Sequence, residues 1–150
     1  MAGNLPGANP IDILLVEDNP GDVRLTKESL KEGKVKNTLY VATDGIEAMQ
    51  FLKKEGKFSN APRPDLILLD LNLPKKDGKE LLADIKNDND LKSIPVVILT
   101  TSKADEDILQ TYKLHANCFI TKPVDLEQFI HVVQSIENFW LTIVKLPTED

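Results

Sequence analysis

Five short, almost unbroken apolar runs divide this sequence, and they limit its fold more than any other feature. The runs cover residues 11–16, 38–42, 66–69, 96–99 and 118–120, and Gly, Pro, Asn or Asp residues bound them. Short runs rich in Val, Ile and Leu are typical of strands that are buried on both faces. Longer segments with helical spacing follow the runs. This alternation predicts an α/β fold, in which helices cover both faces of a five-stranded parallel sheet.

The apolar positions between and after these runs predict five helices. Val23, Thr26 and Leu30 fall on one face of the first helix, which has Pro20 near its start and Gly33 at its end. The second helix is indicated by Ile46, Met49, Phe51 and Leu52, the third by Leu81, Leu82 and Ile85, and the fourth by Ile108, Tyr112 and Leu114. The last helix extends from about residue 125 to residue 145 and is unusually apolar.

Polar residues that suit a catalytic or metal site follow four of the predicted strands. They are Glu17 and Asp18 after the first strand, Asp70 after the third, Thr100 after the fourth, and Lys122 and Pro123 after the fifth. Ligands of open α/β sheets bind outside the carboxyl ends of the strands, so these groups should meet on one rim. Carboxylates about 5 Å apart repel one another by roughly 3 kcal/mol at an effective dielectric constant near 20. A hard divalent cation such as Mg²⁺ removes that repulsion.

Each of these residues also has an ordinary structural interpretation. The segment 17–20 is typical of a helix N-terminus, and both roles can hold if Asn19 or its neighbour caps the helix while Glu17 and Asp18 face a metal ion. An Asp at a strand end is usually a turn former, whereas a carboxylate aimed at a metal-held phosphoryl group is a nucleophile. Thr100 suits a strand as a β-branched residue, and Lys122 suits a solvated surface. Pro123 restricts the backbone of Lys122 and makes a shaped loop possible.

Taken together, these motifs resemble the receiver domain of two-component response regulators over about residues 11–137. They are Glu17-Asp18, Asp70 within Leu-Leu-Asp-Leu-Asn-Leu-Pro-Lys-Lys-Asp-Gly, Thr100, and Lys122-Pro123. The resemblance implies a flavodoxin-like, doubly wound sheet in the order 2-1-3-4-5 and phosphoryl transfer from the phosphohistidine of a histidine kinase. It implies that Asp70 is the phosphoacceptor and that Mg²⁺, with Mn²⁺ or Ca²⁺ as substitutes, is held by Glu17, Asp18, Asp70 and the backbone carbonyl of Asn72. Thr100 and Lys122 would sense the phosphate, and Phe119 would be the switch aromatic.

Three longer stretches are similar to single-domain regulators that serve bacterial phytochromes, especially cyanobacterial ones. They are Val-Glu-Asp-Asn-Pro-Gly-Asp-Val-Arg-Leu, Leu-Thr-Thr-Ser-Lys-Ala-Asp-Glu-Asp-Ile and Phe-Trp-Leu-Thr-Ile-Val-Lys-Leu-Pro. The implied partner is a phytochrome-type histidine kinase. Two features depart from the common receiver pattern: Glu17 stands where many receivers carry Asp, and residues 57–64 look like an insertion that lengthens a loop.

The two ends of the chain are expected to lie outside the receiver unit. Residues 1–10 are predicted to form a flexible segment, and residues 138–150 a helix extension and tail. The apolar surplus at Phe139, Trp140 and Ile143 exceeds what one sheet can cover, which favours a symmetric homodimer through this surface, although extra core packing is the alternative. We expect output through protein contacts with an unknown downstream partner, or by competition for phosphate, because no DNA-binding or catalytic domain follows.

Composition limits the possible partners and locations. A net charge of −6 argues against a nucleic-acid surface, and no apolar run approaches the roughly 20 residues that cross a membrane. The single cysteine, Cys118, excludes an internal disulfide and suits the cytoplasm. We therefore expect a phosphoacceptor protein and not a conventional enzyme. Three alternatives remain: a degenerate receiver, a flavin-binding flavodoxin-like protein and a hydrolase that uses an aspartyl phosphate. Glu17-Asp18 would repel a flavin phosphate, and the hydrolase lacks a second acid at position 72.

Overall fold

The computed structural model describes residues 11–31, 37–71, 73, 77–100, 118–122 and 124–134, and here five parallel strands form one sheet in the order β2-β1-β3-β4-β5. The strands are β1 (Ile11–Val16), β2 (Asn37–Ala42), β3 (Leu66–Asp70), β4 (Val96–Thr100) and β5 (Cys118–Thr121). Each strand differs from its predicted range by at most one residue at one end. The predicted sheet order and strand directions are therefore confirmed.

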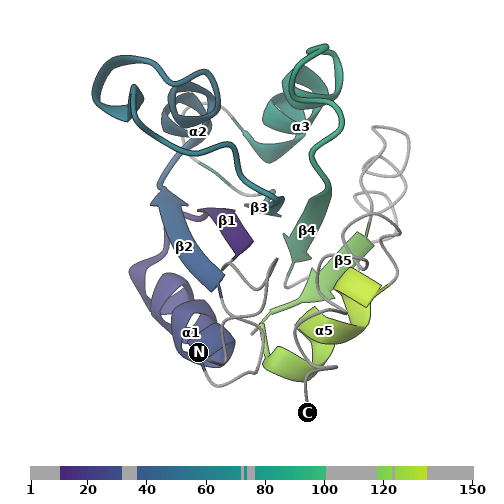
Figure 1. The fold of residues 1–150 in the computed structure, drawn as a ribbon. Coiled ribbons are helices and arrows are strands. Elements are labelled where there is room, and N and C mark those ends of the chain that lie inside the picture. Colours follow the sequence, from purple (N-terminus) through teal and green to yellow (C-terminus); the bar gives the residue numbers. More distant parts are fainter. Residues whose placement is uncertain are drawn as a thin grey trace, which may run out of the picture.

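Helices cover both faces of this sheet, as Figure 1 shows. One face carries α1 (Pro20–Lys31) and α5 (Leu126–Gln134), and the other carries α2 (Gly45–Leu52) and α3 (Gly78–Lys86). A 3₁₀ turn, η1 (Gly56–Phe58), follows α2. The predicted fourth helix, residues 1–10 and the predicted continuation of the last helix beyond residue 134 lie outside the described residues.

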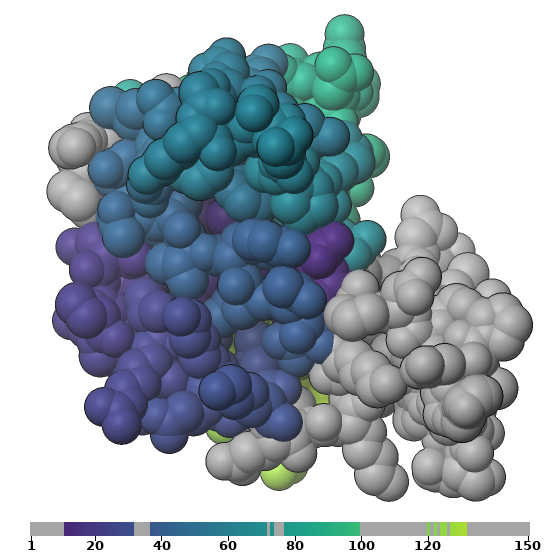
Figure 2. Space-filling view, turned by 60° about the vertical axis from the view of Figure 1, so that its left-hand side comes forward, coloured from purple at the N-terminus to yellow at the C-terminus, as the bar shows by residue number. Residues whose placement is uncertain are grey.

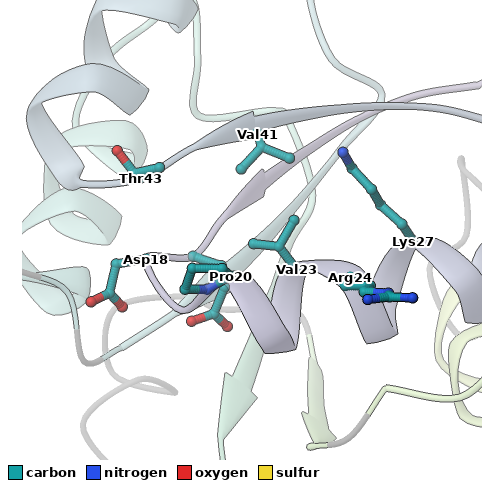
Figure 3. A pocket seen from close by; sticks show the side chains of 8 residues that line it. Asp18, Pro20, Val23, Arg24, Lys27, Val41 and Thr43 are labelled. Atoms are coloured by element: carbon teal, nitrogen blue, oxygen red, sulfur yellow. The ribbon is translucent and has the colours of Figure 1, made fainter.

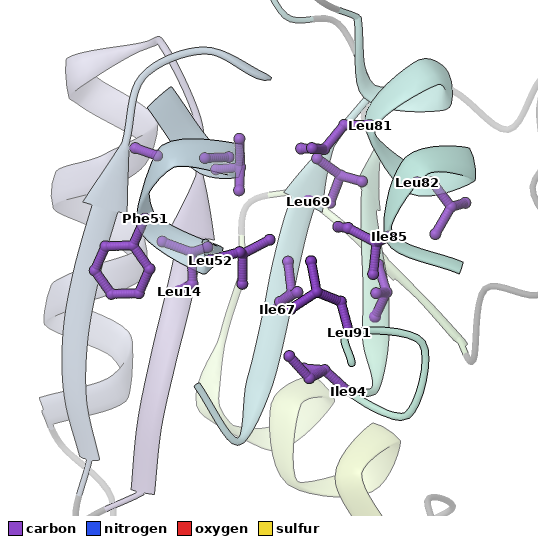
Figure 4. Packing of buried hydrophobic residues seen from close by; sticks show 14 of the residues in the cluster. Leu14, Phe51, Leu52, Ile67, Leu69, Leu81, Leu82, Ile85, Leu91 and Ile94 are labelled. Carbon is purple, nitrogen blue, oxygen red and sulfur yellow. The ribbon is translucent and has the colours of Figure 1, made fainter. Parts of the chain in front are cut away.

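Two hydrophobic clusters fill the spaces between the sheet and its helices. Alternate residues of a strand point to opposite faces, so Ile13 of β1 belongs to the cluster under α1 and α5, whereas Leu14 belongs to the cluster under α2 and α3. Figure 4 shows the second cluster, where Phe51 of α2 and Leu81 of α3 lie over the sheet. Strands buried on both faces explain the continuous apolar runs of the sequence.

The predicted inner face of α2 is wrong at one position. Ile46 is 48% exposed, whereas Gly45, Ala48, Phe51 and Leu52 are buried. The helix turns Gly45 and Ala48, together with Phe51 and Leu52, toward the sheet. The large aliphatic side chain at position 46 therefore lies on the outer surface.

The insertion-like segment before β3 forms a loop, as predicted, and packs closely on its neighbours. The Phe58 ring meets the Phe51 ring edge-on, with centroids 5.5 Å apart. The Arg63 guanidinium donates to the Asp90 carbonyl at 2.6 Å and to the Ser93 hydroxyl at 2.9 Å. Figure 2 shows this segment, in teal, on the same side of the molecule as β2 and α1.

Two lysines fix the loop that joins α3 to β4, at the amino-terminal end of the sheet. Lys53 forms an ion pair with Asp88, whose Oδ1 also accepts the backbone N–H groups of Asp90 and Leu91. The Lys86 ammonium donates to the carbonyl oxygens of residues 92 and 94 at 3.2 and 3.1 Å. Burial lowers the pKa of Lys86.

Within the ranges that the structure describes, no helix combines the length and the apolar character needed to cross a bilayer.

Candidate functional site

The end of β1 and the start of α1 place the first two acidic residues. The backbone N–H of Glu17 donates to the Ala42 carbonyl at 2.9 Å, which continues the pairing of β1 with β2 by one residue. Asn19 Oδ1 accepts the backbone N–H of Asp22 at 3.0 Å, and the Asn19 N–H donates to Glu17 Oε2 at 3.2 Å. Asn19 therefore caps α1, as predicted, and leaves Glu17 buried and Asp18 exposed beside it.

The junction between β3 and α3 places Asp70. Asp70 is the last residue of β3 and is buried. The Gly78 N–H donates to the Leu71 carbonyl at 3.1 Å. A Cβ atom at position 78 would lie 2.6 Å from both the Asp70 carbonyl oxygen and Leu71 Cα, so only glycine fits against this backbone. Asp77 caps α3 by accepting the Glu80 N–H at 2.9 Å, which fixes the helix start.

Glu17, Asp18 and Asp70 meet at the carboxyl end of the sheet, as their positions after β1 and in β3 predicted. One carboxylate oxygen from each residue lies within 4.8 Å of the others. Octahedral Mg²⁺ with ligands at about 2.1 Å holds them about 3.0 to 4.2 Å apart, and carboxylate oxygens are among its preferred ligands. The spacing and chemistry of these three side chains therefore fit a small divalent cation after a modest adjustment.

Lys122 follows β5 and contacts three carboxylates at this rim. Its Nζ lies 2.6 Å from Glu17 Oε1, 3.1 Å from Asp70 Oδ2 and 3.1 Å from Asp22 Oδ2. The lysine side chain is only 9% exposed, so it is not the solvated surface residue of the alternative interpretation. Sequence reasoning missed Asp22, because an acidic residue in the first turn of a helix has an ordinary explanation in the helix dipole.

The shared ammonium and the burial of this rim shift two pKa values. Burial raises the pKa of Glu17 to about 7, in spite of the opposing hydrogen bond from Lys122. Burial alone would lower the pKa of Lys122, but hydrogen bonds to Glu17, Asp70 and Asp22 outweigh it and raise that pKa above the usual lysine value. Lys122 therefore stays charged, while Glu17 changes its charge near neutral pH.

The structure tests the other predicted site residues only in part. The backbone places Thr100 at the end of β4 beside Thr121, and Phe119 beside Ile98. Both residues therefore belong to strands that end at or near this rim, but their side chains lie outside the described part. Three further sets of predicted residues lie wholly outside it: the metal ligand Asn72, the loop-shaping Pro123, and the interface residues Phe139, Trp140 and Ile143.

A hollow of about 400 Å³ opens beside the acidic pair, between α1 and β2. Val23 and Val41 lie on opposite sides of it, with Asp18 at one end and Lys27 at the other (Figure 3). Glu17 and Asp18 both line this hollow, so the acidic pair can be approached along α1.

The sequence was compared with models of known protein families. A model of the response regulator receiver domain matches residues 13–134. This chain belongs to that family. It is therefore the receiver domain of a two-component response regulator, with the predicted fold.

The chain is also similar to phytochrome response regulators. Response regulator Rcp1 of Synechocystis sp. is 53% identical over 92% of this chain and 94% of its own length. Its Mn²⁺-bound crystal structure has a TM-score of 0.73, with 88% of this chain and 95% of that chain covered. The phosphorylated cyanobacterial phytochrome response regulator RcpA is 53% identical, with a TM-score of 0.75 and coverage of 89% and 95%. The bacteriophytochrome response regulator AtBRR is 42% identical, with a TM-score of 0.80 and coverage of 88% and 96%.

Proposed function

We propose that this receiver accepts a phosphoryl group on Asp70, from the phosphohistidine of a histidine kinase and with the help of bound Mg²⁺. One observation carries the proposal. The Lys122 ammonium contacts the carboxylates of both Asp70 and Glu17, while oxygens of Glu17, Asp18 and Asp70 lie within 4.8 Å of one another. Among the described residues of this rim, acids outnumber bases, which suits the transfer of a phosphoryl group that arrives with a metal cation.

The residues divide the chemistry as follows. An Asp70 carboxylate oxygen attacks phosphorus, a P–O bond forms, and the P–N bond of the donor breaks, with its electron pair left on the imidazole nitrogen. The Lys122 ammonium lies 3.1 Å from Asp70 Oδ2 and neutralises phosphoryl charge without a proton transfer. Glu17, Asp18, Asp70 and the backbone carbonyl of Asn72 would hold the cation, which neutralises charge on the phosphoryl oxygens.

The output of the phosphorylated protein is part of the same proposal. The Thr100 hydroxyl donates to the new phosphoryl group, and Phe119 changes its rotamer in response, which alters the surface that a downstream protein contacts. A symmetric dimer through Phe139, Trp140 and Ile143 stays a prediction from the sequence. The similarity to Rcp1, RcpA and AtBRR supports a phytochrome-type kinase as the donor and a cytoplasmic setting.

Label transfer tests the proposal directly. A phytochrome-type histidine kinase, autophosphorylated with radiolabelled ATP, is mixed with the chain and Mg²⁺. Wild type should gain label, D70N should gain none, and D88N, which changes a partly buried aspartate in a loop at the amino-terminal end of the sheet, should match wild type. Chelation of Mg²⁺ should abolish transfer. Undiminished labelling of D70N would move the acceptor elsewhere, and an unlabelled wild type, with acetyl phosphate also ineffective, would favour a degenerate receiver.

A further inference from the structure

We infer that Asp22 acts on this site through the Lys122 ammonium, for which it competes with an incoming phosphoryl group, and that it tunes the site between cation binding and phosphoryl binding. The inference rests on the proposed function and adds a residue to it. Asp22 Oδ2 and Asp70 Oδ2 lie at the same distance from Lys122 Nζ, 3.1 Å, so the two carboxylates share one ammonium.

The local structure fixes Asp22 in this role. The Asn19 cap accepts the Asp22 N–H at 3.0 Å, which holds the backbone of the first turn of α1. The Asp22 side chain is 32% exposed, so it has access to solvent, yet its carboxylate contacts Lys122. An interaction with the helix dipole alone does not require this contact. The ion pair also joins α1 to the residue that follows β5, 100 positions along the chain.

Asp22 affects two ligands in opposite directions. Its charge lies beside Glu17 and Asp70, so it adds to the negative potential that attracts a divalent cation. The same charge repels an incoming phosphoryl group and competes with it for Lys122. Removal of the charge should therefore weaken cation binding and strengthen phosphoryl binding. General damage to the site would weaken both.

The test uses D22N, which removes the charge and keeps the size of the side chain. Mg²⁺ alone is titrated first, and beryllium fluoride, a phosphoryl mimic, is titrated at saturating Mg²⁺, with backbone amide NMR shifts as the readout. For D22N we expect Mg²⁺ affinity to fall about threefold and beryllium fluoride affinity to rise about threefold. Both changes are modest because solvent and salt screen a partly exposed charge.

Two variants control for other effects. E28Q removes one negative charge from the same helix at an exposed ion pair with Arg24, and should match wild type in both titrations. D22E keeps the charge and should stay close to wild type. An unshifted D22N, or a D22N that loses affinity for both probes, overturns the inference. A wild type that binds neither probe would overturn the proposed function as well, so the two failures are distinguishable.

Discussion

The two ends of the sheet use charged residues in different ways. At the amino-terminal end, Lys53 pairs with Asp88, and Lys86 and Arg63 donate to backbone carbonyls of the loop before β4. Each of these three cations has a partner in that loop. At the carboxyl-terminal end, a single ammonium, Lys122, contacts three carboxylates, and exposed Asp18 lies beside them.

This difference separates groups that stabilise the fold from groups that serve a ligand. Charges that close a loop are balanced within the chain and need nothing further. The carboxylates at the other end repel one another in the absence of a cation, so they cost stability that a bound cation returns. In the part of the chain that the structure describes, the surplus of carboxylates lies at the carboxyl-terminal end of the sheet, where the proposed function places the ligands.

Glycine substitutions are expected to give the largest difference in the free energy of unfolding between the two ends of the sheet. G78A should lower the free energy of unfolding by about 3 kcal/mol, because the new Cβ would meet the backbone of Asp70 and Leu71. G56A, at the other end, should cost only about 1 kcal/mol, since Gly56 has open space around it and only a φ of +56° to maintain. Denaturant unfolding measures both values. Equal costs would mean that the β3–α3 junction adjusts more easily than its packing indicates.

Replacement of one lysine at each end should give the next largest difference in the free energy of unfolding. K122M should lower the free energy of unfolding by about 2 kcal/mol without metal, because Glu17 and Asp70 lose the ammonium between them. Mg²⁺ should restore most of this loss. K86M removes two hydrogen bonds to carbonyls and should cost about 1 kcal/mol, with no response to Mg²⁺. Thermal unfolding with and without Mg²⁺ gives the comparison, and a K122M that Mg²⁺ leaves unchanged would contradict a cation site among these acids.

Between pH 8 and pH 6, the change in Mg²⁺ affinity should show the smallest effect of the three. The pKa of Glu17 is raised from 4.5 to about 7, so without metal the folded chain loses stability as the pH rises from about 4.5 to 7. A cation needs the ionised carboxylate, so Mg²⁺ affinity should fall below about pH 7, by up to about tenfold per unit. Titrations with Mg²⁺ at pH 8, 7 and 6 measure this fall.

The amino-terminal end supplies the contrast to this pH effect. The hydrogen bond from Lys53 lowers the pKa of Asp88, so Asp88 stays ionised over the same range. Its contribution to stability is lost only as the pH falls through that lowered pKa. D88N should therefore leave the pH dependence of Mg²⁺ binding unchanged between pH 6 and 8. A wild-type affinity that is flat over this range would contradict the raised pKa of Glu17.

The strands could be predicted closely from the sequence, because a parallel strand buried on both faces leaves a continuous apolar run. The buried face of α2 could not be predicted fully, since Ile46 is exposed while Gly45 and Ala48 are buried. The hydrophobic pattern gives weight to large side chains. It does not detect a buried helix face that includes small residues such as Gly45 and Ala48.

The site was predictable where strand ends supply its residues, and less so elsewhere. Glu17, Asp70 and Lys122 follow from the rule that the carboxyl ends of parallel strands share one edge. Asp22 and Gly78 lie in helices, and their importance comes from a contact across 100 residues and from a close backbone approach. Neither interaction has a local pattern in the sequence.

The contacts of Lys122 join residues that lie far apart in the sequence, and this determines when the complete site can form as the chain folds. Its contacts with Asp70 and Asp22 span 52 and 100 positions, so they form only after β5 has been synthesised and has docked on β4. Closure of loops this long carries an entropic cost that must be met before the contacts contribute. A nascent chain that ends before β5 would contain Asp70 and its acidic neighbours without the ammonium that they share. Only a chain folded through β5 would hold all of these groups together.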